Sequence, residues 1–415
     1  MNKTIINKLS NKFNLKNYLY LFLLILSGEI IFSLPFHLPR FFRPSFLIEY
    51  QISNTQLGNI FAIYGITAML SYFPGGWLAD RIKTNYLIGS SLVLTSLGGL
   101  YLYNGVSYIE LQILYGFWGI TTILLFWGAL IKATRLWREK NQGFAFGTLE
   151  GGRGLVAAVF ASLAFLVFTF FITKNGKHNS FNNVVFFYSL ITLFTGILTF
   201  LFIKENKGPD LYSLVSVSEF IKIIKSKKIF LISSIIFLSY SCYKGTDIYA
   251  LYFYDVLGYS EEQSSYYITN MSYIRPFAAM TAGLLADRYS PSKVIFCMFF
   301  LLSITYAIMS FINLNVFYAN IIFVNIAVSL LAIFSLRAVY FALLSEVNIP
   351  KKDTGITVGI VSLVGFTPDI FFSSLIGKVI DSNRNIIGYQ NCFLILLFLS
   401  IIGICLIYFN QHFKK

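Results

Sequence analysis

The sequence predicts an all-α polytopic membrane protein with twelve transmembrane helices in two pseudo-symmetric six-helix bundles. Three observations lead to this prediction. Of the 415 residues, 56% are hydrophobic and 12% are charged, a balance that soluble domains do not show. Apolar runs of about twenty residues recur along the chain, each long enough to cross a hydrocarbon core of roughly 30 Å. A charged motif in the first half of the chain also returns in the second half.

The repeated motif lies where one apolar run ends and the next begins. Residues 76–81 read Gly-Trp-Leu-Ala-Asp-Arg, and residues 283–288 read Gly-Leu-Leu-Ala-Asp-Arg. The motif resembles the signature of the major facilitator superfamily (MFS), which stands between the second and third helices of each half. Lys83, Thr84 and Asn85 depart from the rest of that signature. The resemblance implies a gating network at the cytoplasmic side, formed by Gly76, Asp80, Arg81, Gly283, Asp287 and Arg288.

The apolar runs divide into two sets. The N-terminal bundle is expected over residues 1–203, with spans at 17–38, 54–81, 86–103, 108–135, from 143 onward and 184–203. A polar, lysine-rich cytoplasmic linker is expected at 204–228, where a Gly-Pro pair breaks the helical pattern. The C-terminal bundle is expected over 229–415, with spans at 229–254, 264–286, a ninth after the second motif, 316–344, an eleventh after 353 and 391–408.

The net charge of +14 comes from Lys and Arg residues in the short connections between apolar runs. If both termini are cytoplasmic, about twenty-one of them fall in cytoplasmic segments and about five in outer ones. This bias predicts an integral protein of a bacterial inner membrane with both termini cytoplasmic. A nucleic-acid partner is not expected, because the charges do not share one soluble face.

The sequence contains no pattern that indicates an enzyme or a bound metal. The four cysteines lie inside apolar runs without metal-ligand spacing and are expected to be reduced core residues. A nucleophile with a paired base, a phosphate-binding glycine loop and a zinc spacing are all missing. We therefore expect no cofactor and no enzymatic activity.

Ionisable residues inside the spans are unevenly distributed. They fall on the first, fourth, fifth, seventh, eighth, tenth and eleventh spans and not on the third, sixth, ninth or twelfth. An ionised side chain facing lipid costs at least about 2.5–3.5 kcal/mol, so these helices are expected to share a polar interior. The resemblance implies the same division, with the charged helices around a central cavity. These residues are Glu29, Lys132, Glu150, Arg153, Lys244, Asp247, Arg275, Arg337 and Asp369.

The cations suggest an anionic substrate, since the planar guanidinium of Arg suits carboxylate or phosphate. The candidate substrate-binding residues are Arg275, Arg337, Lys244, Tyr243, Tyr340 and Arg153. Arg275 and Arg337 have a second interpretation, as structural bridges to Asp247 or Asp369 on neighbouring helices. Pro276 and Pro368 also have two interpretations. Each leaves a backbone carbonyl without its hydrogen-bond donor, and that carbonyl could face a cavity, or each merely bends its helix.

Proton coupling requires a carboxylate that changes protonation as its surroundings change. Glu29, Asp247 and Asp369 are the candidates, and Glu150 is a weaker one because Arg153 lies three residues away on the same face. Lys244 and Asp247 have the same spacing and could neutralise each other. Lys132 is expected to extend its amine to the cytoplasmic boundary of the membrane.

Together these features predict a monomeric secondary transporter that works by alternating access. The predicted activity is proton-coupled uptake, by symport, of a small organic anion. Residues 137–147 resemble the helix junction of carriers for organic phosphates and sugar acids, although Glu29 stands in the first helix, where organophosphate antiporters have an Arg. The alternatives are a carrier for a zwitterionic or neutral solute such as an amino acid or nucleoside, an efflux antiporter, and a membrane receptor on the same fold.

Overall fold

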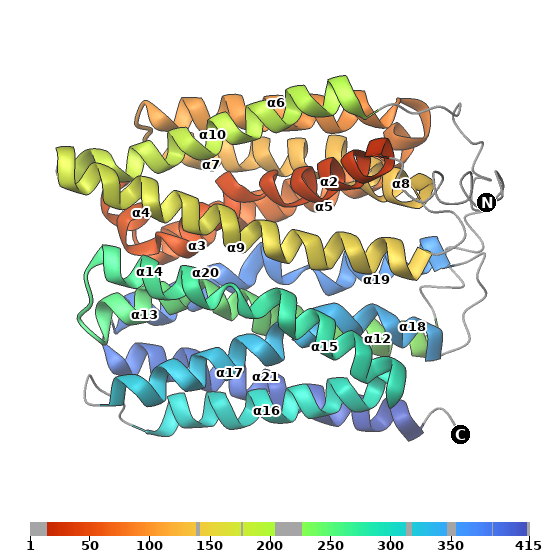
Figure 1. The fold of residues 1–415 in the computed structure, drawn as a ribbon. Coiled ribbons are helices and arrows are strands. Elements are labelled where there is room, and N and C mark those ends of the chain that lie inside the picture. Colours follow the sequence, from red (N-terminus) through yellow and green to blue (C-terminus); the bar gives the residue numbers. More distant parts are fainter. Residues whose placement is uncertain are drawn as a thin grey trace, which may run out of the picture.

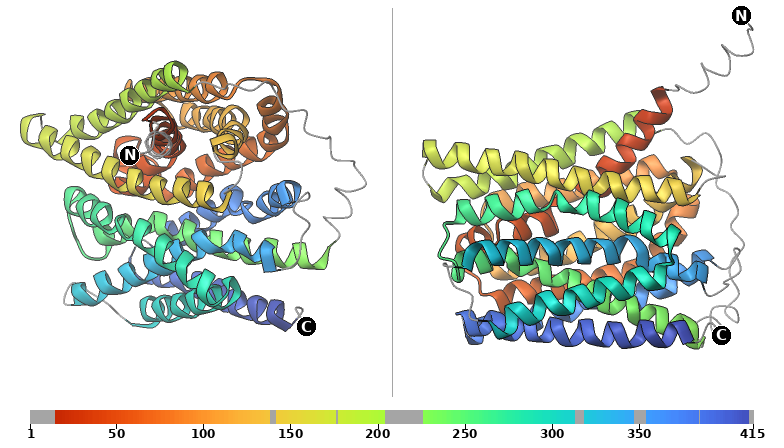
Figure 2. Two further views of the ribbon diagram at one scale, coloured as in Figure 1. Left: turned by 45° about the vertical axis from the view of Figure 1, so that its right-hand side comes forward. Right: turned by 60° about the horizontal axis from the view of Figure 1, so that its bottom comes forward.

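The computed structural model describes residues 15–137, 142–175, 177–203, 226–312, 318–346, 354–383 and 385–412, and these residues form long helices that run side by side. Figure 1 shows two layers, with the first half of the chain above and the second half below. The helix α2 begins and α21 ends at the same end of the molecule, on the right in Figure 1. We call this the terminal end, and the opposite end, where α5 and α14 begin, the far end. Figure 2 shows the same two layers from other sides.

In the first half, several spans are made of more than one helical segment. The first span joins α2 (Leu15–Ile30), the π-helical turn η1 (Ser33–His37) and α3 (Leu38–Phe41), and α4 (Arg43–Glu49) lies across the far end. The fourth joins α7 (Tyr108–Gly119), the π-helical η2 (Ile120–Trp127) and α8 (Gly128–Trp137). The other spans are α5 (Asn54–Arg81), α6 (Thr84–Tyr103), α9 (Gln142–Asn175) and α10 (Lys177–Phe202).

The second half repeats this plan with different breaks. Its first span joins α12 (Lys227–Lys244), the 3-10 turn η3 (Gly245–Ile248) and α13 (Tyr249–Asp255), and its second joins α14 (Glu261–Met271) and α15 (Ile274–Arg288). The fourth joins α17 (Ala319–Val339), η5 (Tyr340–Ala342) and α18 (Leu343–Glu346), and the fifth joins α19 (Thr354–Gly365) and α20 (Pro368–Ser382). The remaining two are α16 (Pro291–Phe311) and α21 (Ile386–His412).

The structure confirms the fold class, because a helix or a joined pair stands at each of the twelve expected spans. Within the described residues, ten spans are long and apolar enough to cross a membrane. The two that do not meet this measure are α5 and the α14–α15 pair, which are helical as expected. The predicted linker at 204–228 lies almost wholly outside the described residues.

Capping residues explain where the far-end helices begin. Ser53, Ser107 and Ser260 each accept a hydrogen bond from a backbone amide three residues on, and the side chain at that later position bonds back to the serine amide. This reciprocal capping box satisfies two amides that would otherwise lack partners at a helix start. The starts of α5, α7 and α14 are therefore set by local sequence.

The two halves meet mainly through α5 against α20 and through α9 against α14 and α15. Glycine allows α5 and α20 to approach closely near the far end. A Cβ added at Gly58 would lie 2.3 Å from the Cα of Ser374, and one at Gly377 would lie 2.4 Å from the carbonyl oxygen of Asn54. The helices of the third, sixth, ninth and twelfth spans pair away from this interface, α6 with α10 and α16 with α21, at the upper and lower edges of Figure 1.

Candidate functional site

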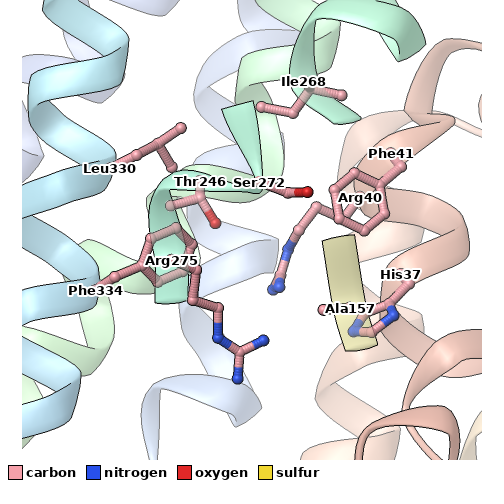
Figure 3. Close-up of a pocket in the computed structure, with 10 residues that line it drawn as sticks. All are labelled: His37, Arg40, Phe41, Ala157, Thr246, Ile268, Ser272, Arg275, Leu330 and Phe334. Atoms are coloured by element: carbon pink, nitrogen blue, oxygen red, sulfur yellow. The ribbon is translucent and has the colours of Figure 1, made fainter. Parts of the chain in front are cut away.

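A pocket between the two halves is lined by three ionisable side chains, His37, Arg40 and Arg275, which contact further charged residues of the spans. Figure 3 shows the guanidinium groups of Arg40 and Arg275 and the imidazole of His37 pointing into the same space. Thr246 and Ser272 add hydroxyl groups to its wall. We call this the central pocket, and its apolar lining comes from Phe41, Ala157, Ile268, Leu330 and Phe334.

Glu29 is the centre of a first ionic group that joins the halves. Its Oε2 lies 3.0 Å from Nε of Arg153 on α9, in the same half. Its Oε1 lies 2.6 Å from a terminal nitrogen of Arg275, which belongs to the other half. All three side chains are at least 88% buried. Removing one member of a buried pair costs about 3–5 kcal/mol, because the other charge stays buried.

Asp247 is the centre of a second group that also joins the halves. Nε of Arg40 lies 2.6 Å from its Oδ1, and Nζ of Lys244 lies 3.3 Å from its Oδ2. Arg40 also donates a hydrogen bond of 2.6 Å to the hydroxyl of Tyr243. The pairing of Lys244 with Asp247 is the one that their spacing predicted.

Asp369 extends this second group along α20. Nζ of Lys244 lies 3.3 Å from Oδ1 of Asp369, and Tyr240 donates to the same carboxylate at 2.9 Å. Lys244 also lies over the rings of Phe36 and Phe61 at 4.9 and 4.8 Å, so an otherwise desolvated ammonium contacts two aromatic faces. A continuous row of charges therefore runs from Arg40 to Asp369 across the interface.

Arg337 differs from Arg40, Arg153, Lys244 and Arg275, which all pair with carboxylates. Within the described residues it makes no ion pair, and its Nη1 is buried without a hydrogen-bond partner. Its guanidinium lies 3.8 Å from the centroid of the Tyr243 ring. A cation–π contact contributes up to about 2 kcal/mol, whereas burying an ion costs several kcal/mol. The ring alone does not offset the burial of this charge.

Glu150 lies at the margin of the site. Its Oε1 is 2.5 Å from a terminal nitrogen of Arg153, the pair that their spacing predicted. Nearly half of the Glu150 side chain, 48%, is exposed, in contrast to the buried Glu29. Glu150 therefore lies on the solvent-facing side of Arg153.

Two predicted contacts differ in the structure. Asp247 and Asp369 were named as possible partners of Arg275 and Arg337, but Arg275 pairs with Glu29 and Arg337 with neither. The sequence shows which spans carry charged residues. Which of these residues meet depends on how the helices are shifted and rotated against one another, and packing determines that. The Lys132 side chain is 7% exposed, and its Nζ donates at 3.0 Å to the carbonyl of Ala79, near the end of α5 at the terminal end; its predicted extension to the membrane boundary stays a prediction.

Sequence analysis overlooked His37 and Arg40 as members of the site. It ended the first span at residue 38 and assigned Arg40 to the following connection. In the structure the chain stays helical to Phe41, because the π-helical turn η1 accommodates Pro35 without ending the span. The sequence did contain an indication that both residues belong to the site. They lie less than four helical turns after Glu29 and could continue the same span.

The signature residues lie at the terminal end. Arg81 is exposed, and its guanidinium lies 4.0 Å from the Trp77 ring. Asp287 and Arg288 are exposed as well, and a Cβ added at Gly76 or Gly283 would meet no described atom within 4 Å. The side chain of Asp80 is outside the described part. The predicted gating network with facing helices therefore stays a prediction.

The far end is closed by contacts between the halves. The carboxylate of Asp381 on α20 accepts hydrogen bonds from the backbone amides of Asn54 and Thr55, at 3.2 and 2.6 Å. Ser45 donates to Glu261 at 2.8 Å. Toward the terminal end, a Cβ added at Gly147 or Gly151 of α9 would meet no described atom within 4 Å. The described contacts between the start of α5, α4, α14 and α20 therefore hold the halves together at the far end.

Two membrane-spanning bundles around a charged central pocket define a polytopic transport protein. Comparison with known proteins agrees: residues 21–367 match the model of the Major Facilitator Superfamily. The chain belongs to this family of transporters. The inner membrane protein YihN of Escherichia coli K12 is 30% identical over 391 residues, which cover 89% of this chain and 90% of YihN. The inner membrane protein YqcE of the same organism is 27% identical, over 88% and 87% of the two chains.

Solved structures share the fold at low sequence identity. A bacterial homolog of the human lysosomal transporter Spinster, in an inward-facing and unoccupied conformation, matches with a TM-score of 0.75. It is 14% identical over 96% of this chain and 97% of the homolog. A point mutant of the nucleoside transporter NupG matches with a TM-score of 0.72 at 12% identity, over 96% of this chain and 100% of NupG. These likenesses extend over both halves.

Proposed function

We propose that the protein is a proton-coupled symporter that takes up a small organic anion by alternating access through the central pocket. The observation on which this rests is Arg337, the buried guanidinium without a carboxylate partner. Around the pocket, six buried or partly buried cations, Arg40, Arg43, Arg153, Lys244, Arg275 and Arg337, accompany four carboxylates, Glu29, Glu150, Asp247 and Asp369. The excess is two positive charges, which an anionic substrate would reduce.

The geometry also supports recognition of a planar or tetrahedral anionic group. The Arg337 guanidinium lies 3.8 Å from the centroid of the Tyr243 ring, and its buried Nη1 has no partner among the described residues, so it can donate a hydrogen bond to a carboxylate or phosphate oxygen. Tyr340, three residues further along the chain, is buried beside it. Arg40 lies over the same Tyr243 ring, 4.6 Å from its centroid, and Figure 3 shows Arg40 and Arg275 reaching into the central pocket from the two halves. An anion between these groups would contact both halves at once, as alternating access requires.

Several properties of this proposal rest on sequence and family. The basic connections favour cytoplasmic termini, so the terminal end would face the cytoplasm and the closed far end would face outward. The inner-membrane names of YihN and YqcE support a bacterial inner membrane. Proton symport would drive uptake along an inward proton gradient, with Glu29, Asp247 and Asp369 as carboxylates that could change protonation. The carrier would work as a monomer.

The first test is a thermal-shift screen of the purified carrier against sugar acids, organic phosphates, di- and tricarboxylates, amino acids and nucleosides, because a ligand of the folded state raises its stability. The stabilising class is then measured against Arg337→Gln. Loss of a charge-assisted contact of about 1.5–3 kcal/mol should raise the half-saturating concentration about 10- to 150-fold. Lys378→Gln, which removes an exposed charge from α20, is the control and should change nothing.

A carrier for a zwitterionic or neutral solute is the second candidate. It is favoured by the fact that Arg40, Arg153, Lys244 and Arg275 already pair with carboxylates. Stabilisation by amino acids or nucleosides alone, with equal half-saturation in the wild type and Arg337→Gln, would support this candidate and contradict the anion proposal.

A further inference from the structure

His37 is a buried titratable group with an unused nitrogen. The side chain is 4% exposed and lies at the last position of the π-helical turn η1. Its Nε2 lies 3.2 Å from Oε1 of Glu29, whereas its Nδ1 is buried and meets no hydrogen-bond partner among the described residues. A neutral imidazole donates from one nitrogen and accepts at the other. With Nε2–H donating to Glu29, Nδ1 is an acceptor without a donor.

This nitrogen belongs to a side chain that lines the central pocket. Figure 3 shows the imidazole next to Ala157, on the side of the pocket toward which Arg40 and Arg275 also extend. A buried acceptor without a donor is unfavourable, and protonation turns it into an N–H donor that needs an acceptor and carries a charge, so the proton is held only where Glu29 and an anion in the pocket offset its burial. Histidine is the side chain whose ordinary titration falls between pH 5 and 8. Insertion of a π-helical turn, a feature frequent at functional sites, places it at this position.

The decisive contact is the oxygen that His37 shares with the other half of the protein. Oε1 of Glu29 receives both Nε2 of His37, at 3.2 Å, and a guanidinium nitrogen of Arg275, at 2.6 Å. His37 and Glu29 belong to the first half, and Arg275 to the second. From these contacts we infer that His37 binds the coupling proton at Nδ1 and that its protonation loosens the bridge between Glu29 and Arg275.

The inference rests on the proposed proton-coupled transport and gives it a residue and a mechanism. A proton from the pocket adds to Nδ1, no covalent bond breaks, and the imidazole becomes a cation. The imidazolium competes for Oε1 of Glu29 and repels Arg275, so the attraction between the halves at this point falls. The far end, closed in this structure, can then open.

All charged groups near His37 act on this step. Burial of the imidazole is the largest effect and opposes the added charge; Glu29 on α2 attracts the proton, and Arg40 on α3 and Arg275 on α15 oppose it. Arg153 on α9 and Asp247 on η3 act through their pairs with Glu29 and Arg40. An anion that covers Arg40 and Arg275 removes the opposition, so anion and proton each favour binding of the other. Such reciprocal coupling typically changes affinity about 5- to 150-fold.

The test uses imidazole nitrogen NMR on the full-length carrier in lipid nanodiscs. The chain has three histidines, so His178→Gln with His412→Gln leaves His37 as the single one. We expect its Nδ1 resonance to change from the unprotonated to the protonated form between pH 5 and 8. A His37 resonance that stays neutral throughout this range would overturn the inference and leave the anion site at Arg337 untouched.

A second measurement follows the halves themselves. Spin labels at Tyr86→Cys and Tyr289→Cys, exposed positions in opposite halves near the terminal end, report the separation of the halves in a cysteine-free background. We expect acidification from pH 8 to pH 5.5 to shift the ratio of the two conformations at least fivefold toward the shorter distance. His37→Gln keeps an amide that can donate to Glu29 but cannot titrate, and it should abolish this shift.

The outcomes separate this assignment from the proposed function. If the substrate identified in the screen still accumulates along a pH gradient in His37→Gln as in the wild type, His37 is not the coupling residue and the symport proposal stands. If the wild type accumulates no substrate in response to a pH gradient, proton coupling and the role of His37 both fall. A His37→Gln carrier that exchanges substrate across the membrane but no longer accumulates it would support the inference.

Discussion

The contact between Asp381 and the start of α5 makes a quantitative prediction about the closed far end. Asp381 of the second half accepts hydrogen bonds from the backbone amides of Asn54 and Thr55 and from the Asn54 side chain, at 3.2, 2.6 and 3.2 Å. It thus acts as an additional cap on a helix of the other half, where the amides and the helix dipole both favour an anion. Asp381→Ala removes this interaction without a large change in volume.

The size of the effect follows from what replaces the contact. Hydrogen bonds to a charged group contribute about 1.5–3 kcal/mol, but Asp381 is only partly buried and water can take its place when the halves separate. We therefore expect a net loss of about 1–2 kcal/mol, which shifts the ratio of open to closed far end by about 5- to 30-fold. Arg43, which donates to the Asn54 side chain at 2.9 Å, cannot compensate, because a guanidinium has no acceptor for the freed backbone amides.

Distances between spin labels at Ile48→Cys and Ile387→Cys, exposed residues at the far end of the two halves, would measure this ratio. Asp381→Asn is the matched variant, because it keeps an acceptor oxygen without the charge and should show a smaller shift. An unchanged distance distribution in Asp381→Ala would refute the argument that this carboxylate holds the far end closed. An equal shift in both variants would show that the acceptor oxygen kept in Asp381→Asn does not help to hold the far end closed.

Two further predictions concern single contacts. Gly58→Val should hinder closure of the far end, since even its Cβ would lie 2.3 Å from the Cα of Ser374, and the labels of the previous experiment should report a larger separation. Normal closure in this variant would contradict the tight approach of α5 and α20. Lys132→Met should lower the free energy of unfolding by about 1–2 kcal/mol, because the Ala79 carbonyl loses its donor near the end of α5. Thermal unfolding would measure this loss, and an unchanged unfolding temperature would argue against that role of Lys132.

Much of the membrane architecture was predictable, because the bilayer imposes simple requirements on each span separately. A span must be long and apolar, and its backbone must be hydrogen-bonded internally. The predicted spans consequently agree with the helices, from the start of α5 at Asn54 to the long α21. The first span differs at its end, because a proline normally indicates a helix end and here a π-helical turn continues the helix past Pro35.

Pairs close in sequence were also predictable. Glu150 with Arg153 and Lys244 with Asp247 are three residues apart, so local helical geometry brings them together. The pairs that join the halves have no such signal. Glu29 and Arg275 are separated by 246 positions, and Arg40 and Asp247 by 207. Which cation meets which carboxylate depends on how far the helices slide and rotate against one another, and packing of both halves determines this.

By itself, the sequence determined the class of protein, the number of spans, the duplicated signature and the set of charges that must avoid lipid. These follow from local composition and from the cost of placing charge in hydrocarbon. Helix packing, by contrast, determines that Arg337 has no carboxylate partner among the described residues, that Arg275 and His37 share one oxygen of Glu29, and that the halves join at the far end. Such contacts arise from the relative position of distant helices, where a shift of a few ångströms exchanges one partner for another.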